Sequence, residues 1–194
     1  PTVTIGAPSV SAANGSATVT YTLTYSESVT SSLDAGDITV TNGGTASSAV
    51  LSITNVTATT ADVNINVGTG DGAVTITVAA GTGTDAAGNV EASGAGPSAA
   101  FTEDNTIPAV NISSPLDGAT VSGTVIITAT ATDTGGSGIN HVEFFINASS
   151  VGTDSSDPYE YSWVTSTGSY DLRADAYDNA GNSALDDDTN VTVP

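Results

Sequence analysis

Two nearly identical acidic phrases carry residue types that could bind a cation. They are DAAGN at Asp85–Asn89 and DNAGN at Asp178–Asn182. Ca²⁺ takes about six to eight oxygen ligands from carboxylates, amide side chains and backbone carbonyls, and glycine lets carbonyls turn toward a shared ion. The same residue types also make good solvated turns, so both interpretations stay open at this point.

Residues suited to enzymatic chemistry are few. His141 is the only histidine and has outward parity at the start of an expected strand, so a nucleophile and base pair would need a distant serine. Asp171 and Asp175 share a strand face, but Arg173 lies between them and no cleft for glycoside hydrolysis is indicated. The chain has no cysteine, which excludes thiol chemistry. We therefore predict that the protein is not an enzyme.

The charge balance is strongly acidic. Asp and Glu number 21 against a single Lys or Arg, giving a formal net charge of −20. Phosphate backbones and anionic membrane surfaces would be repelled, so we expect no nucleic-acid partner. No apolar run approaches the length of a membrane span, and we expect no membrane insertion. The sequence opens at Pro1 without a signal-peptide pattern, which suggests a processed or excised piece.

The apolar residues alternate with polar ones in short runs. Hydrophobic residues make up 38% of the chain, and runs such as ATVTYTLTY and AVTITVAA indicate folded strands rather than disorder. Pro, Gly, Asn and Asp separate these runs, and no long amphipathic helical period is present. The sequence therefore predicts an all-β fold of antiparallel strands.

Repeated phrases indicate two modules. PTVTI at Pro1 recurs as PAVNI at Pro108, and the interval is near the ~100 residues of an immunoglobulin-like sandwich. The boundary falls in TEDNTIP, where proline and Asn/Asp favour a turn over a strand. We predict two tandem immunoglobulin-like antiparallel β-sandwiches, at residues 1–104 and 105–194.

The strands of the second module can be placed by their alternation. They are expected at residues 125–133, 141–147, 159–164 and 170–178. In the last of these the inward set is Tyr170, Leu172, Ala174 and Ala176. Tyr170 follows the turn STGS, where an immunoglobulin-type sandwich places its tyrosine corner.

Aromatic residues in this module could fill the core or contact sugars. Tyr159, Tyr161 and Trp163 alternate with polar residues, which favours the core. Phe145 has outward parity beside His141 and is the better candidate for a surface contact.

The chain resembles the bacterial immunoglobulin-like domains that are strung in tandem along large surface adhesins and other secreted proteins. The second module matches through PAVNISSPLDGATVSGTVIITATATD, GINHVEFFINASSVGTD and PYEYSWVTSTGSYDLRADAYDNAGN. The first looks like a sister type through YTLTYSESVTSSLDAGDITVTNGG and the DNTIP junction. The resemblance implies a spacer, adhesive or calcium-rigidified stalk module at the cell surface, and it identifies no ligand.

The topology expected of such a sandwich gathers acidic loops at one end, because the incoming linker and the B–C, D–E and F–G loops share that end. Like charges crowded there repel unless a cation sits among them. We predict a Ca²⁺ site at the junction from Glu103, Asp104, Asn105, Asp133, Asp154, Asp157 and Asp178, and a second, partial site from Glu27 and Asp85.

The leading hypothesis is a non-enzymatic, extracellular module pair that acts as a stalk or adhesin and is held in line by Ca²⁺. Its expected partners are neighbouring immunoglobulin-like modules, with surface glycans or proteins as further contacts. Two alternatives are a subunit of an extracellular filament built from identical copies, and an accessory carbohydrate-binding module. The acidity also fits adaptation to high salt without a specific ion, and the sequence does not separate this from calcium binding.

Overall fold

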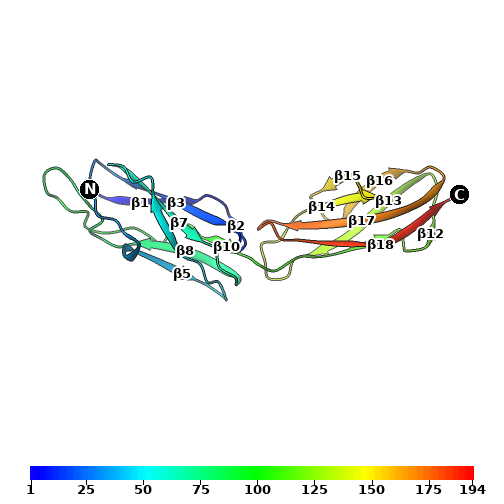
Figure 1. Ribbon diagram of the computed structural model, residues 1–194, viewed down its shortest axis with the longest axis horizontal. Helices are drawn as coiled ribbons and strands as arrows, with labels where there is room; N and C mark the ends of the chain where they lie inside the picture. The colour runs from blue at the N-terminus through cyan, green and yellow to red at the C-terminus, as the bar shows by residue number, and fades with distance from the viewer. The chain divides into compact units, whose positions relative to one another are not determined.

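Strands account for almost all of the regular structure in the computed structural model (Figure 1). The structure describes residues 1–194, except that residues 187 and 188 are described only as part of a strand. The one helical segment in the described chain is a short 3-10 turn, η1, at Ala35–Asp37. The all-β class is therefore confirmed. Among the described residues, no helix has the length and apolar character that crossing a membrane requires.

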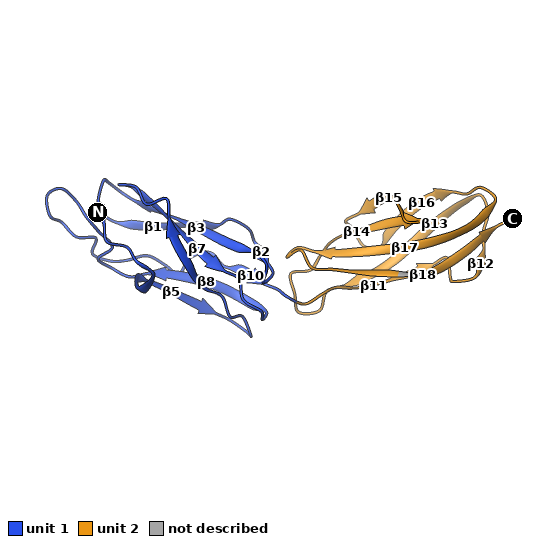
Figure 2. Ribbon diagram, viewed as in Figure 1, with its two compact units in different colours: residues 1–105 blue, residues 106–194 orange. Residues whose placement is uncertain are grey.

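The chain divides into two compact units, Pro1–Asn105 and Thr106–Pro194 (Figure 2). Each unit has its own cluster of buried apolar side chains. The division falls one residue after the boundary drawn from the sequence, within the same TEDNTIP segment.

Unit 1 consists of two four-stranded sheets and a small two-stranded one. The first sheet, in spatial order, is β1 (Val3–Pro8), β3 (Thr18–Tyr25), β7 (Thr60–Asn66) and β6 (Ala49–Thr54). The second is β2 (Ala12–Ala13), β10 (Phe101–Glu103), β8 (Gly72–Val78) and β5 (Ile38–Asn42). The small sheet pairs β4 (Thr30–Ser31) with β9 (Gly83–Thr84).

Alternation explains the core of unit 1. In β3, Val19, Tyr21, Leu23 and Tyr25 are buried, while the threonines between them are exposed or half-buried. The ring of Phe101 on β10 reaches the same core from the other sheet. Burying side chains of this size contributes about 1.5–3 kcal/mol each, so the two sheets are held together mainly by these inward residues.

Unit 2 consists of a three-stranded and a five-stranded sheet. The first, in order, is β11 (Ala109–Ser114), β13 (Thr124–Thr132) and β16 (Tyr159–Val164). The second is β12 (Ala119–Thr120), β18 (Ser183–Val193), β17 (Gly168–Asp178), β14 (Ile139–Ile146) and β15 (Ser149–Asp154). The four strands placed from the sequence correspond to β13, β14, β16 and β17. Strands β11, β12, β15 and β18 were not placed from the sequence; among them, β15 (SSVGTD) has a single apolar side chain.

The inward residues of unit 2 follow the predicted parity. Leu172, Ala174 and Ala176 of β17 are fully buried, and Trp163 and Tyr159 of β16 are buried as well. The aromatic residues of β16 therefore belong to the core, as predicted.

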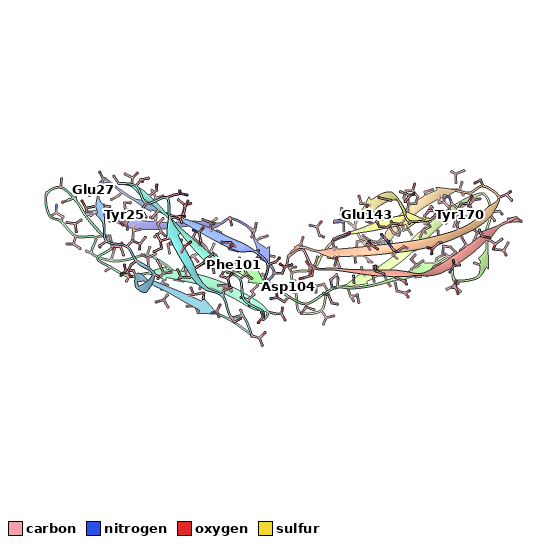
Figure 3. The ribbon with its side chains drawn as sticks, in the orientation of Figure 1. Tyr25, Glu27, Phe101, Asp104, Glu143 and Tyr170 are labelled. Atoms are coloured by element: carbon pink, nitrogen blue, oxygen red, sulfur yellow. The ribbon has the colours of Figure 1, made fainter. Side chains whose placement is uncertain are left out.

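Tyr170 forms the predicted tyrosine corner, although its side chain is only half-buried. Its hydroxyl donates to the Ser166 carbonyl at 3.0 Å, and its ring meets Trp163 edge to face at 4.8 Å between centroids. It lies at the end of unit 2 away from Asp178, where β17 begins (Figure 3).

Replacing Tyr170 by Phe is expected to lower the free energy of unfolding of unit 2 by about 1 kcal/mol, since one hydrogen bond to the backbone is lost. Urea unfolding followed by Trp163 fluorescence measures the change. Tyr177→Phe, on the outward face of the same strand, is the control and is expected to be near neutral. Equal losses in both variants would show that the corner bond contributes nothing particular.

Candidate metal centre

The phrase DAAGN forms a turn that its own aspartate holds closed. Asp85 Oδ1 accepts hydrogen bonds from the backbone N–H of Ala87 at 2.9 Å and of Asn89 at 2.8 Å. Asp85 Oδ2 accepts from the Asn89 side-chain amide at 2.7 Å. Gly88 has a φ of 87°, in the region that favours glycine. Asp85, Ala87, Gly88 and Asn89 thus all contribute to the turn itself.

The phrase DNAGN repeats this turn in unit 2. Asp178 Oδ1 accepts from the backbone N–H of Ala180 at 2.9 Å and of Asn182 at 2.8 Å, and Oδ2 accepts from the Asn182 side-chain amide at 2.8 Å. Gly181 has a φ of 93°. The recurrence seen in the sequence is therefore one turn built twice. A carboxylate offers about four lone-pair sites, so three hydrogen bonds do not exhaust Asp178 as a metal ligand.

Asp133 and Asp178 approach each other at one end of unit 2. Asp133 follows β13, Asp178 ends β17, and oxygen atoms of the two carboxylates lie within 4.8 Å of each other. Asp178 is 4% exposed and Asp133 is half-buried, with its Oδ2 accepting from the Gly138 N–H at 2.7 Å. Two charges at this distance repel by about 3 kcal/mol at an effective dielectric constant of ~20. A cation between them would reverse the sign of that term.

Asp104 lies at the end of unit 1, directly after β10 (Figure 3). Its side chain is buried, and its backbone N–H donates to the Ala13 carbonyl at 3.0 Å. It precedes Thr106, the first residue of unit 2, by two positions. Chain connectivity therefore keeps this carboxylate close to where unit 2 starts.

Glu103, predicted as a ligand, is occupied within unit 1. Its carboxylate is 0% exposed; Oε1 accepts from the N–H of Ser47 and of Gly70, both at 2.9 Å, and Oε2 accepts from the Ser48 hydroxyl at 2.5 Å. Burial raises the pKa of Glu103, but the Ser48 hydroxyl and the loop amides outweigh it and hold the pKa below 4.5. Its carboxylate holds two loops of unit 1 together.

Asn105 is also engaged within unit 1. Its side-chain amide donates to the carbonyls of Gly68 at 3.2 Å and Gly70 at 2.6 Å, and its Oδ1 accepts from the Gly15 N–H at 2.8 Å. Its backbone N–H donates to Asp71 Oδ1 at 2.7 Å. Both polar atoms of the side chain and the backbone N–H thus bond to loops of the same unit.

Asp154 and Asp157, also predicted as ligands, are not grouped with Asp133 and Asp178. Asp154 Oδ2 accepts from the Glu160 N–H at 3.0 Å and Oδ1 from the Ser156 N–H at 3.1 Å, and these bonds lower the pKa of Asp154. Asp157 is exposed. Within the described residues, neither belongs to a group of three or more carboxylates placed to hold one ion.

Glu27 and Asp85 were predicted to form a second, partial Ca²⁺ site, and the structure does not group them with other potential ligands among the described residues. Glu27 Oε1 lies 2.9 Å from the Pro1 nitrogen, and its side chain is half exposed. The Asn89 side chain and backbone lower the pKa of Asp85. In the part of the chain that the structure describes, no group of three or more potential ligands includes either residue.

Sequence reasoning missed Glu91, which is 1% exposed. Its Oε1 accepts from the N–H of Ser93 and of Gly94, both at 2.8 Å, and its Oε2 from the Gly81 N–H at 3.1 Å. Burial raises the pKa of Glu91, but the surrounding backbone amides outweigh it and hold the pKa below 4.5. The only signal in the sequence was a lone glutamate in a glycine-rich loop.

The outward face of β14 and β17 carries the chain's only arginine and histidine. His141 stacks on Tyr177 with ring centroids 4.7 Å apart. Arg173 lies 3.9 Å above the Phe145 ring, and its Nε is 2.9 Å from Asp175 Oδ1. The outward parity predicted for His141 and Phe145 is confirmed, and the Arg173–Asp175 ion pair occupies the face where paired carboxylates were considered.

Comparison with known proteins gives one family match. Residues 108–181 match the family described as Bacterial Ig domain. The matched residues lie within unit 2, and the resemblance drawn from the sequence is confirmed. No curated protein matches the sequence of this chain.

Two solved structures illustrate the likeness. The fibronectin(III)-like modules of Clostridium thermocellum CbhA are 21% identical, with 98% of this chain and 93% of that chain covered and a TM-score of 0.52. The Escherichia coli adhesin FdeC is 15% identical, with 99% of this chain and 63% of that one covered and a TM-score of 0.49. At these identities the clostridial modules show a shared fold alone.

Proposed function

We propose that the chain is a non-enzymatic pair of tandem immunoglobulin-like modules from an extracellular or cell-surface bacterial protein, with a structural or adhesive role. The bacterial Ig domain at residues 108–181 and the two separate cores support this proposal. Its partners are neighbouring modules and surface proteins or glycans. Because Tyr159 and Trp163 are buried in the core, any glycan contact would fall elsewhere, for example at Phe145.

We further propose that Asp133, Asp178 and Asp104 bind Ca²⁺ and so join the end of one module to the start of the next. The observation that carries this is the close approach of two carboxylates in unit 2, one of them almost fully buried, in a chain with almost no cationic side chains to neutralise them. Carboxylate oxygens are hard ligands that suit Ca²⁺, and backbone carbonyls and water would complete its shell.

The proposed ligand set is smaller than the one expected from the sequence. Glu103 and Asp154 belong to no group of three or more potential ligands in the described chain, and both polar atoms of the Asn105 side chain bond to loops of unit 1. Asp157, Glu27 and Asp85 contribute to no grouped site in the described chain. Rigidity of the stalk would then depend on few ligands, so loss of any one should be severe.

The test is a CaCl₂ titration at constant ionic strength, with thermal unfolding of unit 2 followed by Trp163 fluorescence. Ca²⁺ at about 100 times its Kd should stabilise unit 2 by roughly 2.7 kcal/mol by mass action. Asp133→Asn and Asp178→Asn should abolish this response, because each keeps its shape and loses its charge.

Asp85→Asn is the matched control, because Asp85 makes the same turn in unit 1 without the nearby carboxylate pair. It should leave the response of unit 2 unchanged. If EDTA and CaCl₂ have no effect beyond that of NaCl, the calcium proposal is wrong and the acidity serves solubility in salt.

A further inference from the structure

We infer that Asn105 and Glu103 are positioning residues, which hold the linker so that Asp104 is presented as a fixed ligand. The inference rests on the proposed calcium function. Glu103 and Asn105 were expected to be ligands. The inference gives them a different task, which is to hold Asp104, the residue between them.

Glu103 fixes the linker from one side. Its buried carboxylate joins Ser47 and Ser48 of the loop after β5 to Gly70 of the loop before β8. The two loops also bond to each other directly, through Thr45 with Asp71 and Ser47 with Thr69, and the Glu103 carboxylate adds a buried link between them. The backbone at Glu103 is also paired on both sides, with Ala13 of β2 and Gly72 of β8.

Asn105 fixes the linker two residues later, through an amide held in a glycine cradle. Its three side-chain hydrogen bonds go to Gly15, Gly68 and Gly70. A Cβ placed on Gly15 would lie 2.7 Å from the Gly68 carbonyl oxygen and 3.0 Å from Asn105 Oδ1. No side chain larger than hydrogen fits at Gly15 without displacing the Asn105 amide. The three glycines therefore leave the space that the Asn105 side chain occupies.

Asp104 lies between these two anchors, directly after β10. Its N–H bond to Ala13 continues the parallel pairing of β10 with β2 past the end of the strand. The residues on both sides of Asp104 are bonded to loops of unit 1, and its own N–H is bonded to β2, so the backbone that carries its carboxylate is fixed from both sides.

Because Asp104 is already held in place, binding of Ca²⁺ does not have to restrict its backbone further. Residues that orient a metal ligand without touching the metal typically change its affinity by about 10- to 100-fold when they are replaced. Asn105→Ala is therefore expected to weaken Ca²⁺ binding about tenfold, measured by calorimetry at a temperature where both units stay folded.

Asn64→Ala is the matched control. Asn64 lies on β7 of the same unit, and its amide donates to Ser52 and Thr54 while its Oδ1 accepts from Thr20. The variant removes a comparable set of hydrogen bonds away from the linker. It should change the Ca²⁺ affinity by less than about twofold, since a purely structural loss does not reach Asp104.

Asn105→Asp separates a positioning residue from a direct ligand, because the two roles predict opposite signs. As a ligand, a carboxylate would bind Ca²⁺ more tightly than an amide. As a positioning residue, it loses the donors to Gly68 and Gly70 and places a charge against their carbonyls, so binding weakens as in Asn105→Ala.

The possible results are distinct. Weaker binding in both Asn105 variants, with Asn64→Ala unchanged, supports the inference. Unchanged affinity in Asn105→Ala, or tighter binding in Asn105→Asp, overturns the positioning role and leaves the calcium proposal standing. A wild-type chain that does not bind Ca²⁺ overturns both.

Discussion

Replacing Glu103 by Ala is expected to lower the free energy of unfolding of unit 1 by about 3 kcal/mol. The side chain is fully buried and accepts three hydrogen bonds, two from backbone amides and one from the Ser48 hydroxyl. Its removal leaves these donors without their acceptor in a region that water reaches poorly. The cost is therefore larger than the net value of the bonds themselves.

The measurement is urea unfolding with residue-specific detection by NMR, because the only tryptophan reports on unit 2. Amides of Ser47 and Gly70 should lose protection first. Asp62→Ala is the control: its carboxylate is also hydrogen-bonded, to Thr22 and Asn55, but Asp62 is only half-buried on β7. If Glu103→Ala lowers the free energy of unfolding no more than the control does, the Glu103 carboxylate does not hold the two loops together.

Acid should destabilise unit 1 through Glu91. The pKa of its carboxyl in the folded chain lies below the ordinary 4.5, so the unfolded chain takes up the proton first. The stabilisation is then fully present above about pH 4.5 and is lost as the pH falls through the folded-state pKa. The loop from Gly81 to Gly94, which Glu91 holds, should open earliest.

Glu91→Gln tests this by removing the titration. At neutral pH the variant should be about 2 kcal/mol less stable than the wild type, because bonds from amides to a charged acceptor are replaced by weaker neutral ones. Below pH 4 the gap should shrink, since the wild-type carboxyl is then increasingly protonated. Urea unfolding at several pH values measures both. A gap that stays constant with pH would assign the acid sensitivity to other carboxylates.

The strands could be predicted because their information is local. Alternation in TVTYTLTY and YDLRADAYD places the buried side chains correctly, and the tyrosine corner follows from the position of Tyr170 after a turn. The edge strand β15 has no such pattern, since only one of its side chains is apolar. Edge strands pack on one neighbour and need little hydrophobic signal to form.

The candidate site was predictable as a region and not as a ligand set. Topology places Asp133 and Asp178 at one end of unit 2, and the structure brings their oxygens together. Sequence could not show that Glu103 would be bound by Ser47 and Gly70, because those donors are backbone N–H groups on distant loops. Any residue except proline can supply a backbone N–H donor. The sequence therefore cannot distinguish a carboxylate that binds loop amides from one that binds a metal ion.

The turn at Asp178–Asn182 has a consequence for how unit 2 folds. The hydrogen bonds of the Asp178 carboxylate all close within five residues, while Asn179 also bonds to Ser137 and Gly138 of the loop before β14. The turn joins Gly168–Asp178 to Ser183–Val193, the two longest strands of the described structure. Such a hairpin can form in microseconds, before contacts between distant segments are made. We expect it to act as a local folding nucleus, on which β14 and then the opposite sheet assemble.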